Sequence, residues 1–279
     1  MSERWVCGRF EFQLKRPILM GIVNVTPDSF SDGGLHARTE SAIRHAHTLI
    51  QEGADILDIG GESTRPGALA VSVQDELGRV LPVIKALMHS GVAISVDTCK
   101  PEVMQAALDM GADIINDVTG MRDPSAQRIV ARHGQCGVCL MHMQGEPRTM
   151  QDKPHYNDVV QDIKSELIQQ AQLLETMGVQ ASRISLDPGF GFGKTVEQNY
   201  QLLANLNSIV DAGYPVVLGV SRKSMIGAVT EQPVDQRLSG SIAAALAGAL
   251  RGARVLRVHD VRETRDALAV WHAVENAEK

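Results

Sequence analysis

Short runs of apolar, mostly β-branched residues recur along the chain, and longer stretches with helical spacing of apolar positions separate them. The runs are continuous rather than alternating, which is typical of parallel strands buried on both faces. Eight such runs are present, at residues 18–23, 56–59, 92–96, 114–115, 138–141, 184–186, 216–220 and 255–258. The pattern therefore predicts eight parallel strands, each followed by a helix.

Glycines recur in this repeat, a few residues before the strands. Seven of them stand one to six residues ahead of a strand: Gly53, Gly91, Gly111, Gly134, Gly178, Gly213 and Gly252. A helix often ends in a left-handed residue, which glycine adopts without strain, so these positions mark helix ends. An eighth helix, over about residues 261–275, completes the series.

Eight βα units without a linker or a shift in composition predict one domain over residues 1–279, folded as a (β/α)₈ (TIM) barrel of the α/β class. A doubly wound open sheet is the alternative, although it more often has about five to seven strands and one dominant phosphate loop. Residues 1–16 lie outside the repeat, and we expect them to form a short hairpin that plugs the N-terminal end of the barrel.

Composition supports a folded protein and narrows its partners. Of the 279 residues 44% are hydrophobic and 22% are charged, which argues against disorder. The formal net charge of −6 makes nucleic acid and anionic membranes poor partners for the chain as a whole. The N-terminus has no apolar targeting segment and the four cysteines are too few for a disulfide framework, so we expect a cytoplasmic protein.

Cys136 and Cys139 form a C-x-x-C pair, which is the spacing of half a zinc site or of a redox pair. No second ligand pair stands at a suitable distance along the chain, and the pair lies inside an apolar run. We therefore interpret both as buried, inert thiols.

Polar side chains occupy the position where each apolar run ends. They are Asn24, Asp58, Asp97, Asn116 with Asp117, His142, Asp187, Ser221 followed by Lys223, and Arg257 with His259. Any one of them could be a cap for the following helix, but a cap explains eight coincident positions poorly. Because active sites of parallel barrels are built at the C-terminal ends of the strands, the set predicts a polar pocket there.

The residue types in this set indicate two kinds of ligand group. Arg257 and His259 are two residues apart and so face the same way, which suits a phosphate or diphosphate. With Asn24 they make an anion site that could share a metal ion. Asp97 and Asp187 in a pocket, together with Asn116, need several N–H partners, as a planar heterocycle with a guanidine-like edge would supply.

The glycine-rich segment GFGFGKT at residues 189–195 resembles a phosphate-binding loop only in composition. It is one residue short of the P-loop spacing, and its glycines do not follow the dinucleotide pattern. The histidines form no H-E-x-x-H motif, so a catalytic zinc is not indicated either.

Six motifs together resemble the dihydropteroate synthases, over nearly the whole chain. They are NVTPDSFSDGG (24–34), GGESTRPG (60–67), SVDT (95–98), DPGFGFGK (187–194), SRKS (221–224) and RVHDV (257–261), in the order of that family. The resemblance implies a barrel that condenses 6-hydroxymethyl-7,8-dihydropterin diphosphate with 4-aminobenzoate to give 7,8-dihydropteroate and diphosphate. It also implies a homodimer formed through outer helices.

The resemblance further implies a role for each motif residue. Asp187 would accept from the pterin 2-amino and N3 groups, Asn116 would bind the edge of the same ring, Lys223 would donate to its O4 and N5, and Asp97 would face its nitrogens. Arg257, His259 and Asn24 would hold the diphosphate, and Asn24 would also touch Mg²⁺. Thr64, Arg65, Pro66 and Ser221 would border the aminobenzoate, and Phe30, Phe190 and Phe192 lie in loops expected around the substrates.

A dissociative, SN1-like substitution follows from these charges. Arg257, His259 and Mg²⁺ would stabilise the leaving diphosphate, and Asp97 and Asp187 would favour the cation that develops on the dihydropterin. The loops at residues 28–34 and 64–70 combine Gly, Pro and Ser with few apolar anchors, so we expect them to order over substrate. If they do, Arg65→Ala should change turnover.

Two other functions remain open at this point. A methyltetrahydrofolate methyltransferase would share the pocket of Asp97, Asn116 and Asp187, but it has no use for Arg257 with His259 or for the TRPG loop. A catalytically silent paralogue that binds pterin would have lost a motif residue, and no matched position has lost one.

Overall fold

The computed structural model describes residues 4–26, 35–63, 70–145, 149–150 and 154–277. Its main sheet has eight parallel strands in the order β8-β7-β6-β5-β4-β3-β10-β9. They are β3 (Ile18–Asn24), β4 (Ile56–Gly60), β5 (Ala93–Asp97), β6 (Ile114–Asp117), β7 (Gly137–Met141), β8 (Ile184–Asp187), β9 (Val217–Leu218) and β10 (Val255–Val258). A parallel bridge between Leu186 and Val216 joins the two ends of this order. The predicted (β/α)₈ barrel is confirmed, and the open-sheet alternative is excluded.

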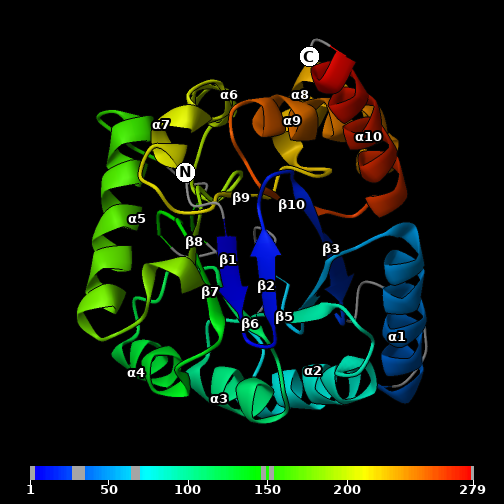
Figure 1. The fold of residues 1–279 in the computed structure, drawn as a ribbon, viewed down its shortest axis with the longest axis vertical. Helices are drawn as coiled ribbons and strands as arrows, with labels where there is room; N and C mark the ends of the chain where they lie inside the picture. The colour runs from blue at the N-terminus through cyan, green and yellow to red at the C-terminus, as the bar shows by residue number, and fades with distance from the viewer. Residues whose placement is uncertain (1–3, 27–34, 64–69, 146–148, 151–153, 278–279) are drawn as a thin grey trace.

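Helices surround the barrel (Figure 1). They are α1 (Leu35–Glu52), α2 (Val73–Leu87), α3 (Pro101–Asp109), α4 (Pro124–His133), α5 (Val159–Thr176), α6 (Val196–Ala204), α7 (Leu206–Val210), α8 (Ser224–Thr230), α9 (Leu238–Leu250) and α10 (Val261–Ala277), with single turns η2 (Ala181–Arg183) and η3 (Val234–Gln236). Two α-helices follow each of β8 and β9, where the sequence predicted one. The last helix begins at Val261, as expected, and continues two residues further.

The seven glycines that predict helix ends all have positive φ, between 77° and 103°. A side chain at such an angle is strained, so glycine is the residue that lets each helix turn back toward the barrel. The left-handed conformation is thus present at all seven positions, although Gly91 and Gly213 stand four and three residues beyond the last residues of α2 and α7.

Five strands extend one or two residues beyond the predicted apolar run, and most of the added residues are polar. Asn24, Asp97 and Asp187 each end a strand, and Asn116 with Asp117 completes another. The backbone ladder continues through these residues because its hydrogen bonds do not depend on side-chain polarity. By contrast β9 is shorter than the predicted 216–220: the chain turns there, with the Lys223 N–H donating to the Val220 carbonyl at 3.2 Å.

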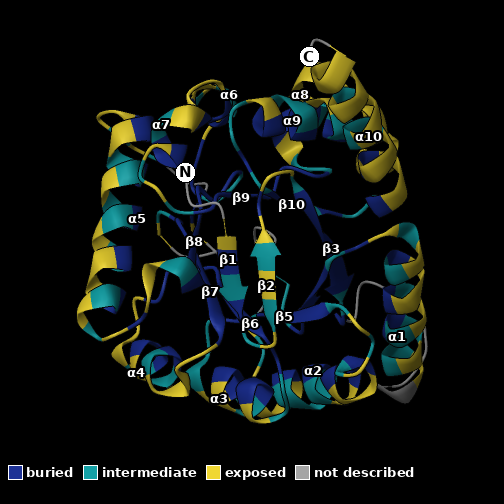
Figure 2. Ribbon diagram, in the orientation of Figure 1, coloured by how far each residue is buried: buried dark blue, intermediate teal, exposed yellow. Residues whose placement is uncertain are grey.

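The N-terminal hairpin is also confirmed, as β1 (Arg4–Cys7) paired antiparallel with β2 (Phe10–Gln13). The fully buried Trp5 donates its indole N–H to the carbonyl of Arg183, immediately before β8, at 3.0 Å. Arg9 forms a two-point ion pair with Asp113, immediately before β6, at 2.8 and 2.7 Å. The hairpin therefore covers the N-terminal end of the barrel and leaves the C-terminal end for chemistry (Figure 2).

The apolar side chains form two main layers. A large cluster lies between strands and helices, and a smaller one fills the barrel beneath the hairpin, with Trp5, Met20 and Ile56 among its members. Cys136 belongs to the outer cluster and Cys139 to the inner one, and both are fully buried and unpaired. Burial raises the pKa of both thiols, which disfavours the reactive thiolate, as expected for buried cysteines. Within the described ranges, no helix is both long enough and apolar enough to span a bilayer.

Candidate active site

Arg257 lies at the centre of the C-terminal face, between two carboxylates. Its Nε donates to Oδ2 of Asp58 at 2.6 Å, and its Nη2 donates to Oδ2 of Asp97 at 2.8 Å. Asp58 is fully buried and also accepts from the Ser95 hydroxyl at 2.6 Å and from Nδ2 of Asn116 at 3.1 Å. Side chains from β4, β5, β6 and β10 thus form one network, as the predicted pocket of strand-end residues requires.

One guanidinium cannot neutralise two buried carboxylates, so the network carries an excess negative charge. Burial, together with the neighbouring charge of Asp58, raises the pKa of Asp97 to about 7 against the opposing effect of Arg257. Sequence reasoning placed Asp58 in the set of strand-end residues but assigned it no ligand, unlike Asp97 and Arg257. Its central position could not be inferred because its partners come from distant strands.

Asn24 ends β3 beside this network. A Cβ placed on Gly60 would lie 3.8 Å from both Asn24 Oδ1 and Asp97 Oδ2. Both oxygens therefore border the space that a side chain at Gly60 would fill. Amide and carboxylate oxygens are hard donors of the kind that Mg²⁺ takes alongside phosphate oxygens and water. Among the described residues no cluster of three or more His, Cys, Asp or Glu side chains could hold a metal on its own.

His259 lies beside Ser221 at the ends of β10 and β9. Nδ1 of His259 is 3.1 Å from the Ser221 hydroxyl, and the His259 backbone N–H donates to the same oxygen at 3.2 Å. Burial and the charge of Arg257 lower the pKa of His259 to about 4. With this pKa His259 is neutral at pH 7 in the free protein, so Arg257 carries the positive charge of the pair and His259 offers a hydrogen bond.

Arg222, between Ser221 and Lys223, was not singled out from the sequence. It has a φ of 58° and forms a two-point ion pair with Asp260, including Nε to Oδ2 at 3.0 Å. The pair ties the loop after β9 to the loop after β10, and so fixes the neighbours of His259.

Asp187 and Lys223 approach the pocket from β8 and from the N-terminus of α8. Asp187 accepts from the Gly189 N–H at 2.7 Å, and Lys223 donates to the Phe190 carbonyl. The Lys223 ammonium also lies 4.2 Å from the centroid of the Phe192 ring. Burial lowers the pKa of Lys223 to about 8, which leaves most of it charged at pH 7.

Phe190 is a correction to the predicted site. Its ring is fully buried in the main core, so it does not line the pocket, and only its carbonyl reaches Lys223. Phe192 is the half-buried ring on the pocket side, packed near Met141 and Met143. Two predicted loops lie outside the described residues. They are residues 28–34, with Phe30, and residues 64–69, with Thr64, Arg65 and Pro66.

Two strand-end residues support loops in place of the pocket. Asp117 accepts from the backbone N–H groups of Thr119 and Met121, both at 2.8 Å, so it holds the loop after β6, whereas Asp123 caps the following helix α4. Nδ1 of His142 lies 3.1 Å from Nζ of Lys194, in the segment after β8, and its Nε2 lies 3.4 Å from a carboxylate oxygen of Glu166 on α5.

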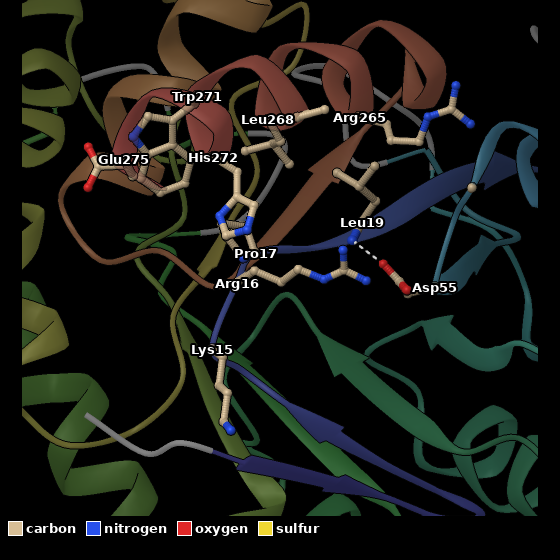
Figure 3. A pocket seen from close by; sticks show the side chains of 12 residues that line it. Lys15, Arg16, Pro17, Leu19, Asp55, Arg265, Leu268, Trp271, His272 and Glu275 are labelled. Atoms are coloured by element: carbon tan, nitrogen blue, oxygen red, sulfur yellow. Dashed lines mark hydrogen bonds between the residues drawn. The ribbon is translucent and has the colours of Figure 1, made fainter. Parts of the chain in front are cut away.

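A cavity of about 340 Å³ lies away from this face, beside the start of β3 (Figure 3). It is lined by the Lys15–Pro17 segment and by α10 residues including Leu268 and Trp271, with Asp55 accepting from the Leu19 N–H at 2.8 Å. None of the predicted site residues lines it, so it is separate from the polar face.

The chain matches the family described as pterin binding enzyme over residues 20–259. It is 50% identical over 274 residues to a dihydropteroate synthase of Neisseria meningitidis serogroup C, covering 97% of each chain. A dihydropteroate synthase structure from Xanthomonas albilineans, with 4-aminobenzoic acid, has a TM-score of 0.92 at 51% identity over 99% of each chain.

A dihydropteroate synthase from Burkholderia cenocepacia, complexed with 7,8-dihydropteroate, has a TM-score of 0.91 at 49% identity, over 99% of this chain and 98% of that one. These matches extend over nearly the whole chain, from the hairpin to the last helix. The chain therefore belongs to the pterin-binding enzyme family, among relatives that are dihydropteroate synthases.

Proposed function

We propose that this protein is a dihydropteroate synthase of folate biosynthesis, which joins 6-hydroxymethyl-7,8-dihydropterin diphosphate to 4-aminobenzoate. The observation that carries the proposal is Arg257 held between Asp58 and Asp97 at the mouth of the barrel. This arrangement puts a fixed cation where a diphosphate can reach it and carboxylates beside it where a heterocycle rich in N–H groups can bind. Relatives that share about half of the sequence bind 4-aminobenzoic acid and 7,8-dihydropteroate.

The pterin ring would lie among Asp187, Asn116 and Lys223. The Asp187 carboxylate accepts from the 2-amino and N3 groups, and Lys223 donates to O4 and N5. Asn116 already donates to Asp58, so its amide oxygen remains free to accept from the ring edge. Their positions on β8, β6 and the start of α8 support this assignment.

The diphosphate would lie over Arg257, His259 and Asn24. Neutral His259 offers a hydrogen bond, and Arg257 offers the charge. The Asn24 amide oxygen would help to hold Mg²⁺ beside the diphosphate, and the ion would add to the neutralisation of the leaving group. The Asn24 amide oxygen at the end of β3, a hard donor beside Gly60, supports this cofactor.

The reaction would be dissociative. The bond between the pterin methylene carbon and the diphosphate oxygen breaks, and the electron pair leaves with the diphosphate, stabilised by Arg257. The dihydropterin delocalises the resulting cation, which Asp97 and Asp187 favour electrostatically. The neutral amine of 4-aminobenzoate then forms the C–N bond and releases a proton, so the enzyme needs no covalent intermediate.

The aminobenzoate would approach from the side of Ser221, with Thr64, Arg65 and Pro66 bordering it. Phe192 joins this group on the evidence of its half-buried ring beside Lys223. Arg65 would complete the site as a catalytic residue on the second loop, and both loops would order over substrate.

The two rival functions differ in what they release. A methyltransferase would not produce diphosphate, and a silent binder would hold pterin without turnover. The test is release of diphosphate from the pterin diphosphate in the presence and absence of 4-aminobenzoate. We expect release that depends on 4-aminobenzoate and is inhibited competitively by a sulfonamide analogue of it; bound pterin without release would favour the silent binder.

We also propose that the enzyme is a cytoplasmic homodimer. Apolar side chains are exposed on α8 (Val229), η3 (Val234), α9 (Leu238) and α10 (Val270 and Val274), with exposed fractions from 37% to 68%. Exposed apolar side chains gathered on neighbouring outer helices are typical of a subunit interface. The four free cysteines fit a reducing compartment.

A further inference from the structure

The segment GFGFG at residues 189–193 forms a turn whose backbone groups are bonded by side chains from several elements. The Gly189 N–H donates to Asp187 at 2.7 Å, the Gly191 N–H donates to Asn199 at 2.7 Å, the Gly193 carbonyl accepts from the Tyr156 hydroxyl at 2.8 Å, and the Phe190 carbonyl accepts from Lys223. These hydrogen bonds from several elements fix a loop that has no regular secondary structure.

The three glycines of this turn are required by its shape. Gly189, Gly191 and Gly193 have φ values of 70°, 79° and 60°. A Cβ at Gly189 would overlap the His142 carbonyl oxygen, and one at Gly193 would lie 2.6 Å from the Gln144 carbonyl oxygen. The alternating glycines therefore serve a tight turn packed against the segment after β7, which explains a motif that resembles a phosphate loop.

Lys194, at the end of the turn, is buried with its ammonium directed back into it. Nζ donates to the carbonyls of Gly189 at 2.8 Å and Phe192 at 3.0 Å, and lies 3.1 Å from Nδ1 of His142. Only 3% of the residue is exposed. A P-loop lysine reaches a phosphate, whereas this lysine uses its hydrogen bonds to close its own loop.

Each of the two carbonyls that Lys194 binds belongs to a residue that contacts a pterin-binding group. Gly189 donates its N–H to the Asp187 carboxylate, and Phe192 places its ring under the Lys223 ammonium. Moving either carbonyl would move the partner of Asp187 or of Lys223. Burial lowers the pKa of Lys194 to about 7, and a neutral amine still has two N–H groups for the two carbonyls.

We infer that Lys194 is a positioning residue for pterin recognition: it closes the 189–193 turn and thereby sets the orientation of Asp187 and Lys223. The inference rests on the proposed function, since it concerns the pterin pocket of the same site. It assigns Lys194 no contact with substrate.

The test compares Lys194→Met with Lys85→Met, a lysine exposed on α2. Lys194→Met should raise the KM for the pterin diphosphate about tenfold, the loss expected when a hydrogen bond to a charged group is misaligned, with kcat changed less than about threefold. Lys85→Met should change neither. A lysine that only supports folding would reduce the amount of active enzyme, and so lower the apparent kcat at an unchanged KM; that result would overturn the inference.

A double-mutant cycle with Lys223→Met adds a second readout. Because Lys194 acts through Lys223 and Asp187, the effect of Lys194→Met on the dissociation constant of pterin, measured by calorimetry, should be smaller in the Lys223→Met background. Strict additivity would contradict this route. Wild-type protein that binds no pterin would instead refute the proposed function, which separates the two failures.

Should Lys194→Met not fold, Lys194→Gln retains an N–H donor at the buried position. Thermal melting decides whether each variant folds, and a folded Lys194→Gln should bind pterin more weakly than wild type. If it folds and binds pterin as wild type does, or if neither variant folds, Lys194 has a structural role only and the inference is wrong.

Discussion

At the residue scale, Arg257 acquires its position from two carboxylates that are far apart in sequence. Asp58 is fully buried and serves Arg257, Ser95 and Asn116 together, so it orients the cation proposed to receive the diphosphate. Burying such a cluster costs desolvation free energy, and a functional arrangement of charges is a better reason for it than stability.

Asp58→Asn should therefore lower kcat/KM for the pterin diphosphate by about 100-fold, because an amide can no longer hold the guanidinium in place. Steady-state kinetics with saturating 4-aminobenzoate measures this. Asp109→Asn, exposed on α3, is the matched control and should leave kcat/KM unchanged. Equal activities of the two variants would show that Arg257 needs no orientation by Asp58.

Asp97 makes the free enzyme less stable as pH rises. Its pKa is about 7 in the folded protein against an ordinary value of about 4, so the folded state holds more protons between these pH values. The contribution of Asp97 to the free energy of unfolding therefore falls from pH 4 upward and levels off above pH 7. Urea denaturation at pH 5.5 and pH 8 should show a larger decrease for wild type than for Asp97→Asn; equal decreases would contradict the raised pKa.

Sequence reasoning found most polar groups of the face but not their partners. Polar residues that follow the apolar runs were predicted to lie at one rim of the barrel, because parallel strands share their C-terminal edge. This reasoning places Asn24, Asp97, Asn116 and Asp187 there. It cannot tell Phe190 from Phe192, since both alternate with glycine and only the left-handed turns decide which ring enters the core. It also cannot detect the low pKa of His259, which results from burial and from Arg257.

At the scale of elements, continuous apolar runs sufficed to locate the eight barrel strands, and glycines with positive φ to locate seven helix ends. The additional helices α7 and α8 were missed. α7 is separated from α6 by Asn205 alone, and α8 has seven residues, so neither leaves a periodic pattern of its own. Pattern reasoning works where an element is long and buried, and fails where local turns divide it.

The hairpin should contribute stability and not catalysis. Trp5→Ala removes a fully buried indole from the N-terminal end of the barrel and should lower the free energy of unfolding by about 3–5 kcal/mol. Trp5→Phe, which keeps an aromatic ring, should lose less. Denaturant titration measures both, and kcat/KM of the folded fraction should match wild type. A large change in KM would mean that the hairpin reaches the opposite face.

At the scale of the whole molecule, one end of the barrel is closed by the hairpin and the other carries the polar network, while exposed apolar side chains collect on α8 to α10. Val270 and Val274 are on one face of α10, four residues apart, and are 68% and 56% exposed. We propose that stability, chemistry and association are divided among these separate surfaces.

We expect wild type to be dimeric and the double variant Val270→Glu with Val274→Glu to be monomeric, because two carboxylates cannot be buried at an apolar interface without large desolvation cost. Sedimentation velocity measures both states. The double variant Glu231→Gln with Asp211→Glu changes two exposed positions that are already polar, so it is the control and should have the same oligomeric state as wild type. A wild-type monomer would refute the proposed interface.

The central claim is that the face around Arg257 forms a C–N bond while it expels diphosphate. Mass spectrometry of a reaction containing the purified enzyme, Mg²⁺, the pterin diphosphate and 4-aminobenzoate tests this most directly. We predict 7,8-dihydropteroate and diphosphate in equal amounts. Diphosphate accompanied only by the hydrolysed hydroxymethyl pterin, or no turnover with pterin bound, would contradict it.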